Sequence, residues 1–474
     1  MTEFLKLVVA TILAMLLMAG CATRHYQAAP ISPAETAANF QLRTLQNSGL
    51  KEYLEKNLGK EKGTWPPNAW DLKMLTLAAF YFNSTLEAER ARLEAAQAAV
   101  TTAGARPNPT VGITPGIPSP YLFGLNLLFP IQTAGKRRYQ AERAKNLGEA
   151  ARFALADTAW KIRNQVRAAL LDLLLASHQL DLLRSEEQIR SIQVDLLEQR
   201  LVVGEISRPE VDRARIELSN IRLAVRNAEG GAARAKATLA GTIGIPVSGL
   251  SGAEFFWPRF EHPPAAESLS PMQIQKEAVL NRLDVRSALA DYAATQSALQ
   301  LEIARQYPDV EIGPGYQYEE KNSFFTVGLS TTLPIFNRNQ GPIAEAEARR
   351  KESEAAFLAT QAQVIAQSET ALARYDAALK ELAEADESLN KIQTVQEQMA
   401  RRAVGIGESD RLELNGVLLQ GSAAAKARLD ALGRAQTALG ELENAVQRPL
   451  APGDLMPPIP DSSLLNRQKQ GGKQ

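Results

Sequence analysis

The residues of this sequence that could do chemistry are charged side chains just after two helix breaks. Carboxylates follow each break, and arginines lie close enough in sequence to pair with them. Carboxylates that converge on an axis can narrow a pore and select cations, and arginines can latch neighbouring helices. Solvated charge at a helix end is the alternative for any single residue. The candidate gate residues are Glu210, Asp212 and Arg215 after the first break, and Glu408, Asp410, Arg411 and Glu413 after the second.

Other arrangements that support catalysis or metal binding do not occur in the sequence. The three histidines, His25, His178 and His262, are far apart and lack an HxxH or HExxH spacing. Cys21 is the only cysteine, and no glycine-rich phosphate loop is found. We therefore expect no enzyme activity, no cofactor and no strongly coordinated metal. His178 lies within a predicted long helix, where a packed or lumen-facing imidazole, rather than a metal ligand, is the expected role.

Composition indicates a large, folded protein with no nucleic-acid partner. The chain has 474 residues, of which 45% are hydrophobic, enough for a sizeable core. Its 53 basic and 53 acidic residues balance, so no positive surface for a phosphate backbone is expected. Abundant alanine after about residue 86 is typical of long helices that pack closely.

The first residues resemble a bacterial lipoprotein signal. Residues 1–20 contain an apolar stretch too short to span a bilayer. Leu17-Met18-Ala19-Gly20-Cys21 resembles a lipobox, with Met18 in the place of the usual leucine. We expect Cys21 to be the lipidated mature N-terminus, and Ala22 to direct the protein to the outer membrane. A chance cysteine after a signal peptide is the alternative.

One short sequence motif occurs twice in the chain, about two hundred residues apart. FGLNLLFPIQTAG begins at Phe123, and VGLSTTLPIFNRN begins at Val327. Each copy of the motif follows a proline-free helical segment and a short stretch in which apolar residues alternate with small or polar ones. Each copy also precedes a long helical segment. The sequence therefore predicts a tandem duplication of helix, hairpin, long helix and helix.

The predicted boundaries follow from proline, glycine and periodicity. A strap at 21–69 follows the signal, and a connector at 247–270 separates the repeats. The first repeat, 70–246, has a hairpin at 108–131, a long helix at 133–203 and a helix at 209–243. The second, 271–448, has a hairpin at 309–335, a long helix at 342–404 and a helix at 409–446. The polar tail is 449–474.

The helix lengths exclude an ordinary globule. At 1.5 Å per residue, a helix over 133–203 is roughly 105 Å long, and each shorter helix is about half that length. Two short helices placed end to end match one long helix. We therefore expect each long helix to run from its hairpin to a distant tip, and its partner to return to the middle.

The strands are long enough to cross a membrane when tilted. One face of each hairpin is apolar, and the other carries glycine, serine, threonine and asparagine. Because four strands cannot close a membrane barrel, several copies must share one. Soluble hairpins that cover helices are the alternative. The expected lipid-facing residues are Phe123, Leu125, Leu127, Phe129, Phe325, Val327, Leu329 and Leu333.

These features together resemble the outer-membrane efflux protein family of the TolC type, over nearly the whole mature chain. The most specific motif is LPIFNRNQG at Leu333–Gly341 followed by IAEAEA, which is similar to the heavy-metal efflux branch. The resemblance implies a mainly α fold with a small β part. It implies a homotrimer with a shared 12-stranded outer-membrane β-barrel and a long α-helical tunnel in the periplasm. A periplasmic adaptor and an inner-membrane pump are the implied partners, with outer-membrane lipid around the barrel.

The resemblance also bears on the tips. Glu210 and Arg215 fall at matching positions of the first tip, whereas Arg411 and Leu414 replace the aspartates of the family archetype, which argues against a gate of that type. The implied adaptor-contact residues are Arg200, Val203, Gly204, Arg401, Val404 and Gly405. The implied function is a passive exit duct for small molecules or metal ions. A type I protein secretion duct and a non-channel structural envelope lipoprotein are the alternatives.

Overall fold

The computed structural model describes residues 25–59, 65–116, 122–265, 270–320, 322–450 and 456–457. The predicted signal peptide, Cys21, residues 117–121 of the first predicted hairpin and most of the tail lie outside these residues. The chain divides into two compact units, Met1–Arg43 and Thr44–Gln474. In the first unit, α2 (Pro33–Gln41) begins with a proline in its first turn, and Ser32 accepts a hydrogen bond from the Glu35 N–H.

The second unit contains two repeats in the predicted order. Two short elements, α3 (Ser48–Leu58) and β1 (Ala69–Trp70), precede them. The first repeat comprises α4 (Leu72–Phe82), α5 (Ser84–Gly104), β2 (Thr110–Pro115), β3 (Leu122–Ile131), α6 (Lys136–Val202) and α7 (Arg208–Ile243). The connector contains η2 (Val247–Leu250) and β4 (Glu254–Phe255), which pairs with β1. The second repeat comprises α8 (Pro271–Asn281), α9 (Leu283–Ala304), β5 (Val310–Glu319), β6 (Asn322–Thr331), α10 (Gln340–Asn390), η4 (Lys391–Glu397), α11 (Gln398–Gly405) and α12 (Arg411–Val446).

The two hairpins can be aligned through their strand pairing. In the first hairpin Val111 pairs with Leu127, and in the second Val310 pairs with Thr331. The first strands are therefore related by an offset of 199 residues (310 minus 111) and the second strands by 204 (331 minus 127). All four strands form one antiparallel sheet in the order β2-β3-β5-β6, so the β3–β5 pairing joins the two repeats.

The short helices differ from the expectation. The sequence suggested one continuous helix before each hairpin, but each of these helices is broken in two. At Asn83 the backbone is extended, and its side-chain oxygen accepts hydrogen bonds from the first N–H groups of α5. At Arg282 the backbone is also extended, and its guanidinium binds Asp284 at 2.6 Å. Local side-chain hydrogen bonds of Asn83 and Arg282, together with tertiary ones to the Thr242 carbonyl and to Gln367, override a continuous helical pattern at these sites.

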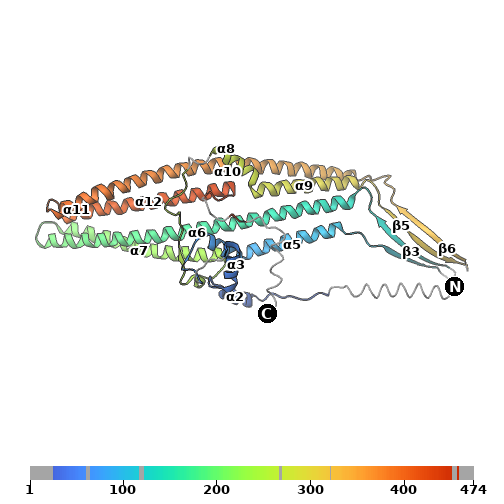
Figure 1. Ribbon diagram of the computed structural model, residues 1–474, viewed down its shortest axis with the longest axis horizontal. Helices are drawn as coiled ribbons and strands as arrows, with labels where there is room; N and C mark the ends of the chain where they lie inside the picture. Colours follow the sequence, from blue (N-terminus) through green and yellow to red (C-terminus); the bar gives the residue numbers. More distant parts are fainter. Residues whose placement is uncertain are drawn as a thin grey trace. The chain divides into compact units, whose positions relative to one another are not determined.

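The long helices give the second unit its long axis. α6 has 67 residues and is roughly 100 Å long. Its counterpart is not one regular helix, because α10 ends at Asn390 and the seven π-helical residues of η4 precede α11. Figure 1 shows the four strands at one end of these helices and the α6–α7 and α11–α12 turns at the other. None of the described helices is both long enough and apolar enough to cross a membrane.

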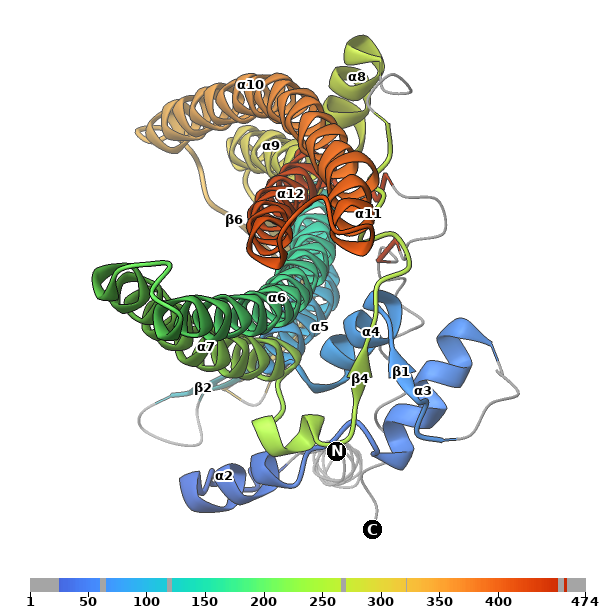
Figure 2. The same ribbon diagram turned by 90° about the vertical axis from the view of Figure 1, so that its left-hand side faces the viewer.

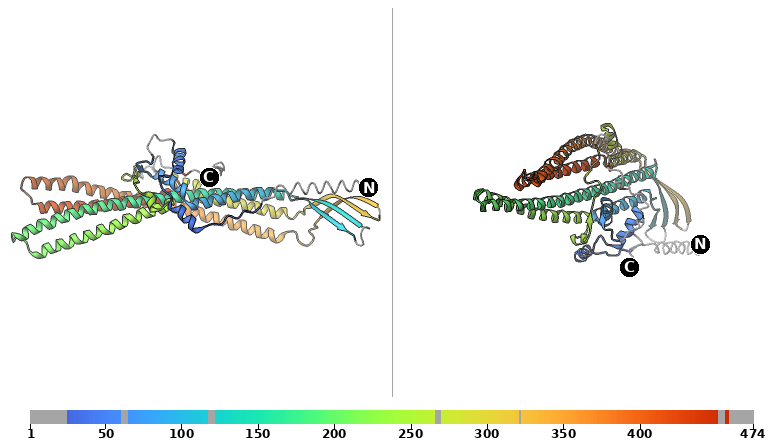
Figure 3. Two further views of the ribbon diagram at one scale, coloured as in Figure 1. Left: turned by 90° about the horizontal axis from the view of Figure 1, so that it is seen from below. Right: turned by 60° about the vertical axis from the view of Figure 1, so that its left-hand side comes forward.

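Apolar side chains fill the space between the helices of each repeat. One cluster joins α3, α4 and α5 to α6 and α7, and a second joins α8, α10 and α12. A third cluster runs along α6 and α7 toward their tip and includes Leu183, Val194 and Val211. Figure 2, viewed toward the tips, and Figure 3 show the α6–α7 pair and the α10–α12 pair as two arms of the unit.

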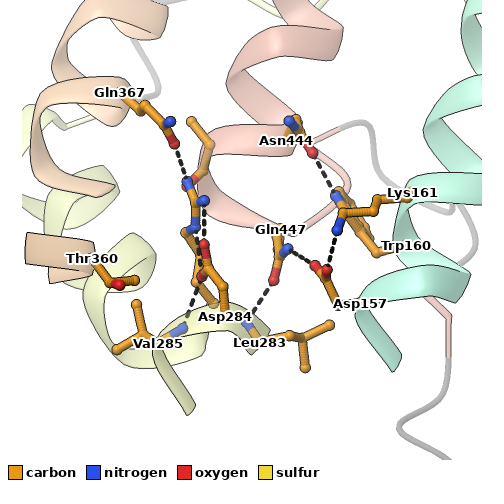
Figure 4. A network of polar contacts seen from close by, with 12 residues as sticks. Asp157, Trp160, Lys161, Leu283, Asp284, Val285, Thr360, Gln367, Asn444 and Gln447 are labelled. Carbon is orange, nitrogen blue, oxygen red and sulfur yellow. Dashed lines mark hydrogen bonds and ion pairs between the residues drawn. The ribbon is translucent and has the colours of Figure 1, made fainter. Parts of the chain in front are cut away.

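A buried polar cluster, here the central joint, links α6 of the first repeat to α12 of the second. Arg163 pairs with Glu443 at 3.0 Å, and both side chains are 1% exposed. Arg167 donates to the Gln436 carbonyl at 2.8 Å, and Gly440 leaves room for its guanidinium, because a Cβ there would overlap it. Beside them, Gln447 donates to Asp157 at 2.7 Å and accepts from the Leu283 N–H at 2.6 Å (Figure 4).

Candidate functional site

The first tip is the turn between α6 and α7, and contacts between residues close together in the sequence define its conformation. Gly204 has a φ of 78°, in the left-handed region that glycine adopts without strain. Ser207 begins α7, and Glu210 accepts hydrogen bonds from the Ser207 hydroxyl at 2.9 Å and from its N–H at 3.3 Å. These hydrogen bonds lower the pKa of Glu210. Glu210 is thus a capping residue of its own helix.

Arg215 and Asp212 connect the two helices of the first arm. The Arg215 guanidinium binds Glu198 of α6 at 2.7 Å and lies 3.6 Å from Asp212. The hydrogen bond and charge of Glu198 raise the pKa of Arg215. Because all three side chains are about half exposed, this contact aligns α7 on α6 and contributes little free energy. Glu198 was not singled out in the sequence, since nothing local marks it as the partner of a residue 17 positions away.

The second tip is the turn between α11 and α12. Gly407 has a φ of 77°, and the Ser409 hydroxyl donates to Glu413 at 2.6 Å. Arg401 pairs with Glu397 one helical turn earlier, at 2.6 Å. Glu408 and Arg411 lie exposed on the same turn. Of the adaptor-contact residues, Val203 is 68% exposed, and Gly204 and Gly405 are exposed, whereas Val404 is half-buried.

One ion pair joins the two tips across the repeats. Arg200, near the end of α6, pairs with Asp410, the residue that precedes α12; their side chains are 34% and 47% exposed. The sequence had assigned Arg200 to the adaptor surface and Asp410 to the gate, and the structure brings them together. Arg200 also lies 3.9 Å from Glu205.

Two further polar contacts between α6 and α12 continue from this pair toward the central joint. The Asn415 amide, which is buried, donates to the Ile189 carbonyl at 2.9 Å. Lys426 pairs with Glu186 at 2.5 Å. We call these three contacts, Arg200–Asp410, Asn415–Ile189 and Lys426–Glu186, the tip latch. Glu186, Asn415 and Lys426 were not anticipated from the sequence, because nothing near them in the chain marks partners that lie more than 200 residues away.

Burial and two neighbouring cations shift the pKa of Glu186 in opposite directions. Burial alone would raise its pKa, but hydrogen bonds and charges from Lys426 and Arg190 outweigh burial and lower it. Arg190 binds Glu186 at 2.8 Å and also Glu217 of α7 at 2.6 Å. Glu186 therefore stays ionised at neutral pH and ties α12 to both helices of the first arm.

The sheet has one apolar and one polar face. Cross-strand partners place Leu125 beside Ile113 and Tyr316, and Phe129 beside Ile312. The residues that share this face are Val111, Ile113, Phe123, Leu125, Leu127, Phe129, Ile131, Val310, Ile312, Tyr316, Tyr318, Phe325, Val327 and Leu329, together with Pro115, Pro314, Ser323 and Thr331. Seven of the eight predicted lipid-facing residues are in this set, and Leu333 lies two residues beyond the end of β6. Gly124, Asn126, Gly328 and Ser330 share the opposite face, and so does Phe324.

No metal-binding cluster of His, Cys, Asp or Glu forms among the residues that the structure describes. His178 is exposed on α6: its Nδ1 lies 2.8 Å from the Leu174 carbonyl, and its ring stacks on Phe260. The described side chains therefore offer a helical stem with polar contacts at its tips and an apolar strand face at its other end.

Comparison with known proteins gives consistent matches. The sequence profile of the family described as "Outer membrane efflux protein" matches residues 82–245 and 274–446, one stretch in each repeat. The cobalt-zinc-cadmium resistance protein CzcC of Cupriavidus metallidurans is 28% identical over 232 residues, which are 48% of this chain and 54% of CzcC. The aligned stretch thus spans about half the length of that relative.

Solved structures share the fold at low sequence identity. The outer membrane protein VceC of Vibrio cholerae superposes with a TM-score of 0.64 and 18% identity, over 80% of this chain and 97% of VceC. The CmeC outer membrane channel of Campylobacter jejuni superposes with a TM-score of 0.63 and 15% identity, over 93% of this chain and 99% of CmeC.

Proposed function

Because this chain belongs to the outer membrane efflux protein family, we propose that it is the passive outer-membrane exit duct of a tripartite efflux pump. The observation that carries the proposal is a sheet with one apolar face at the end of a helical stem roughly 100 Å long. Such a face is stable against lipid, and such a stem can cross an aqueous compartment to meet a partner. Energy then comes from the inner-membrane pump, which passes its cargo to the duct.

The duct requires more than one copy of the chain. Both edge strands of the four-stranded sheet, β2 and β6, lack a second neighbouring strand among the described residues. In lipid, open edges leave backbone groups without hydrogen bonds, and membrane barrels have at least about 8 strands. A homotrimer supplies twelve strands, four from each chain. In that barrel the apolar face contacts outer-membrane lipid, and Gly124, Asn126, Gly328 and Ser330 line the pore.

The N-terminus anchors the duct. Cys21, at the end of the lipobox-like sequence, is lipidated and holds the mature chain at the outer membrane. The stem then projects into the periplasm. Its tips meet the periplasmic adaptor through the residues of the two turns, Arg200, Val203, Gly204, Arg401, Val404 and Gly405.

The tip latch acts as the gate that keeps the periplasmic end narrow. It ties the second arm to the first, and in a trimer three such latches surround one axis. The exposed Arg200–Asp410 pair contributes at most about 1 kcal/mol, so it cannot hold the tip alone. The buried Asn415 and Glu186–Lys426 contacts supply more, because breaking them leaves buried polar groups without partners. The other candidate gate charges, Asp212, Arg215, Glu408, Arg411 and Glu413, border the entrance.

Divalent transition-metal cations are the cargo that we assign. The relative CzcC is named for resistance to cobalt, zinc and cadmium, and the motif LPIFNRNQG is similar to the heavy-metal branch. The polar strand face and the carboxylates of the tips are compatible with hydrated cations.

A deletion strain and a bilayer recording test the proposal. We expect deletion to raise sensitivity to cobalt, zinc or cadmium, and the restored gene to reverse it. The purified protein should conduct ions in planar bilayers, with higher conductance after the Arg200→Ala and Asp410→Ala changes. If the deletion strain failed to secrete a protein but kept its resistance to metals and drugs, the result would favour a secretion duct. A monomer without conductance would overturn the channel and favour a structural lipoprotein.

A further inference from the structure

An exposed arginine lies at each of the four junctions between the helical stem and the sheet. Arg106 precedes β2 by four residues, and Arg305 precedes β5 by five. Arg138 follows β3 and Arg338 follows β6, each by seven residues. With the offset of 199, Arg106 and Arg305 occupy equivalent places in the two repeats. All four residues are exposed, and we call them the arginine collar.

Arginine is confined to this end of the sheet. Neither hairpin contains one, because the sequence has no arginine from residue 107 to 136 or from 306 to 337. Residues 116–121, which connect β2 to β3, carry no charge, and residues 319–321 are two glutamates and a lysine. The collar therefore marks the end of the sheet that joins the stem (Figure 1).

A neighbouring lysine shows how a basic residue with a role inside the chain is placed. The Lys136 ammonium is buried, and it donates to Asp309 at 2.6 Å. Arg106 and Arg338, by contrast, make no side-chain hydrogen bond or ion pair with the residues that the structure describes. The packing of the junctions therefore does not depend on these two collar arginines.

Stabilisation of the helix ends explains only part of the collar. Arg305 ends α9 and binds Glu302 of the same helix at 2.6 Å, and a cation is favourable at a helix C-terminus. Arg138 and Arg338 lie instead at the N-terminal ends of α6 and α10, where a helix carries partial positive charge. Cations are unfavourable there, and an anion from outside the helix would stabilise them.

Aromatic side chains accompany the collar. Tyr307 is 61% exposed and Phe336 is 94% exposed, and each is two residues from a collar arginine. The Cζ atom of Arg138 lies 4.7 Å from the centre of the Tyr139 ring, and the guanidinium donates to the Tyr139 hydroxyl at 2.9 Å. Aromatic rings beside long basic side chains are typical of the boundary between lipid and water.

We propose that the collar binds the phosphate groups of anionic phospholipids in the leaflet that faces the periplasm. The inference rests on the proposed membrane-embedded sheet, and adds the lipid class that this sheet selects and the residues that recognise it. A guanidinium presents a planar pair of donors that matches a phosphate. The acyl chains then contact the apolar face of the sheet, whose pair nearest the stem is Ile131 and Val310.

The pore is the other surface that the collar could face. The charged residues on the polar face of the described strands are Glu311 and Glu319, which are both acidic. They suit a pore for cations, whereas arginines in the pore would repel the cargo that we assign. The exposed rings of Tyr307 and Phe336 would also contact water there. The observations therefore favour lipid as the partner of the collar.

Lipid binding measured by native mass spectrometry tests the collar. The full-length protein should retain phosphatidylglycerol about tenfold more than phosphatidylcholine, and added salt should weaken this preference. Replacement of all four collar arginines by glutamine should abolish the preference. The double variant Arg106→Gln with Arg338→Gln removes no contact within the chain, so it should fold normally and lower the preference to about threefold. A full preference in this folded variant and in the fourfold variant would overturn the collar.

A matched variant controls for net charge. Four exposed arginines of the stem, each paired on the surface, are replaced by glutamine together, and the preference for phosphatidylglycerol should remain; these are Arg222, Arg226, Arg374 and Arg434. An equal loss in both fourfold variants would overturn the collar. Excess inorganic phosphate should not displace the lipid, because it lacks acyl chains for the apolar face. Displacement would assign the arginines to free phosphate and also overturn the collar.

Bilayer recordings separate the collar from the channel. The fourfold collar variant should keep the ion selectivity of the unchanged protein. A shift toward cations with unchanged lipid binding would place the arginines in the pore and overturn the collar. Conductance without a lipid preference overturns the collar but not the duct. A lipid preference without conductance supports the collar and counts against the duct, and loss of both overturns both.

Discussion

The same two helices, α6 and α12, meet at the central joint and at the tip latch, and the two contacts are built differently. At the joint, Arg163 and Glu443 are 1% exposed, and Arg167, Gln436 and Gln447 complete their surroundings. At the latch, Arg200 and Asp410 are 34% and 47% exposed. The difference indicates that the joint fixes the register of the two helices, whereas the latch can open without unfolding the chain.

Dielectric surroundings explain the contrast. A buried ion pair that loses one member leaves an uncompensated charge in the protein interior. An exposed pair that separates is rehydrated, and its separation costs at most about 1 kcal/mol. Between these extremes lie Glu186 and Lys426, which are partly buried.

Removal of the buried carboxylate should have the largest effect. Glu443→Ala should lower the free energy of unfolding by about 3–5 kcal/mol, because two buried arginines lose their counter-ion. Denaturant unfolding of the purified protein measures the change. Glu441→Ala is the control two residues away: its pair with Arg374 is exposed, so the loss should stay below about 1 kcal/mol. Equal losses for the two variants would contradict the contrast.

Removal of Glu186, in the inner part of the latch, should destabilise the protein less than removal of Glu443, and only near the tips. Glu186→Ala removes hydrogen bonds to two cations, and we expect a loss of about 1.5–3 kcal/mol that is confined to the tips. Hydrogen exchange should accelerate in residues 180–200 and 411–426 and stay unchanged near Glu443. If protection near Glu443 fell as much, the joint and the latch would be one cooperative unit.

Acid should open the latch through the same residue. The folded pKa of Glu186 lies below its ordinary value of 4.5, so the folded chain binds fewer protons than the unfolded chain. Its stabilising contribution is therefore present above about pH 4.5 and is lost as the pH falls through the folded pKa. Conductance in bilayers should rise in this acidic range and return on neutralisation. At neutral pH the Glu186→Gln variant should conduct more than the unchanged protein, and its conductance should not rise further in acid. If its conductance rose in acid as much as that of the unchanged protein, another group would be responsible for the acid response.

The outermost pair should have the smallest effect on stability. Arg200→Ala and Asp410→Ala should each change the free energy of unfolding by less than about 1 kcal/mol, while conductance rises. The exchange of both charges, Arg200→Asp with Asp410→Arg, should restore low conductance if the ion pair itself, rather than either side chain alone, keeps the tip narrow. Arg434→Ala, which breaks an exposed pair with Glu381 away from the tips, should leave conductance unchanged.

Much of the architecture could be predicted from the sequence, because its signals are local. The alternation of Phe123, Leu125, Leu127 and Phe129 predicted a strand with one apolar face, and the cross-strand register of the sheet places these four residues on one face. The breaks at Asn83 and Arg282 were missed, because Asn83 also donates to the Thr242 carbonyl and Arg282 to Gln367, partners that lie 159 and 85 residues away in the sequence.

The candidate site was anticipated by position but not by pairing. The sequence marked Arg200 and Asp410 separately, and their ion pair joins residues that lie in different repeats. Glu210 was marked for a gate, whereas the structure uses it to cap α7. Glu186, Asn415 and Lys426 were missed, because their partners lie more than 200 residues away.

The sequence by itself determined the periodic elements, the two glycine-containing turns and the duplication, since each depends on residues close together in the chain. Only the tertiary structure decided which charges of α6 meet which charges of α12. The helical period fixes the face on which a side chain lies. It does not fix how far one helix slides along another, and that register is set by packing at the central joint.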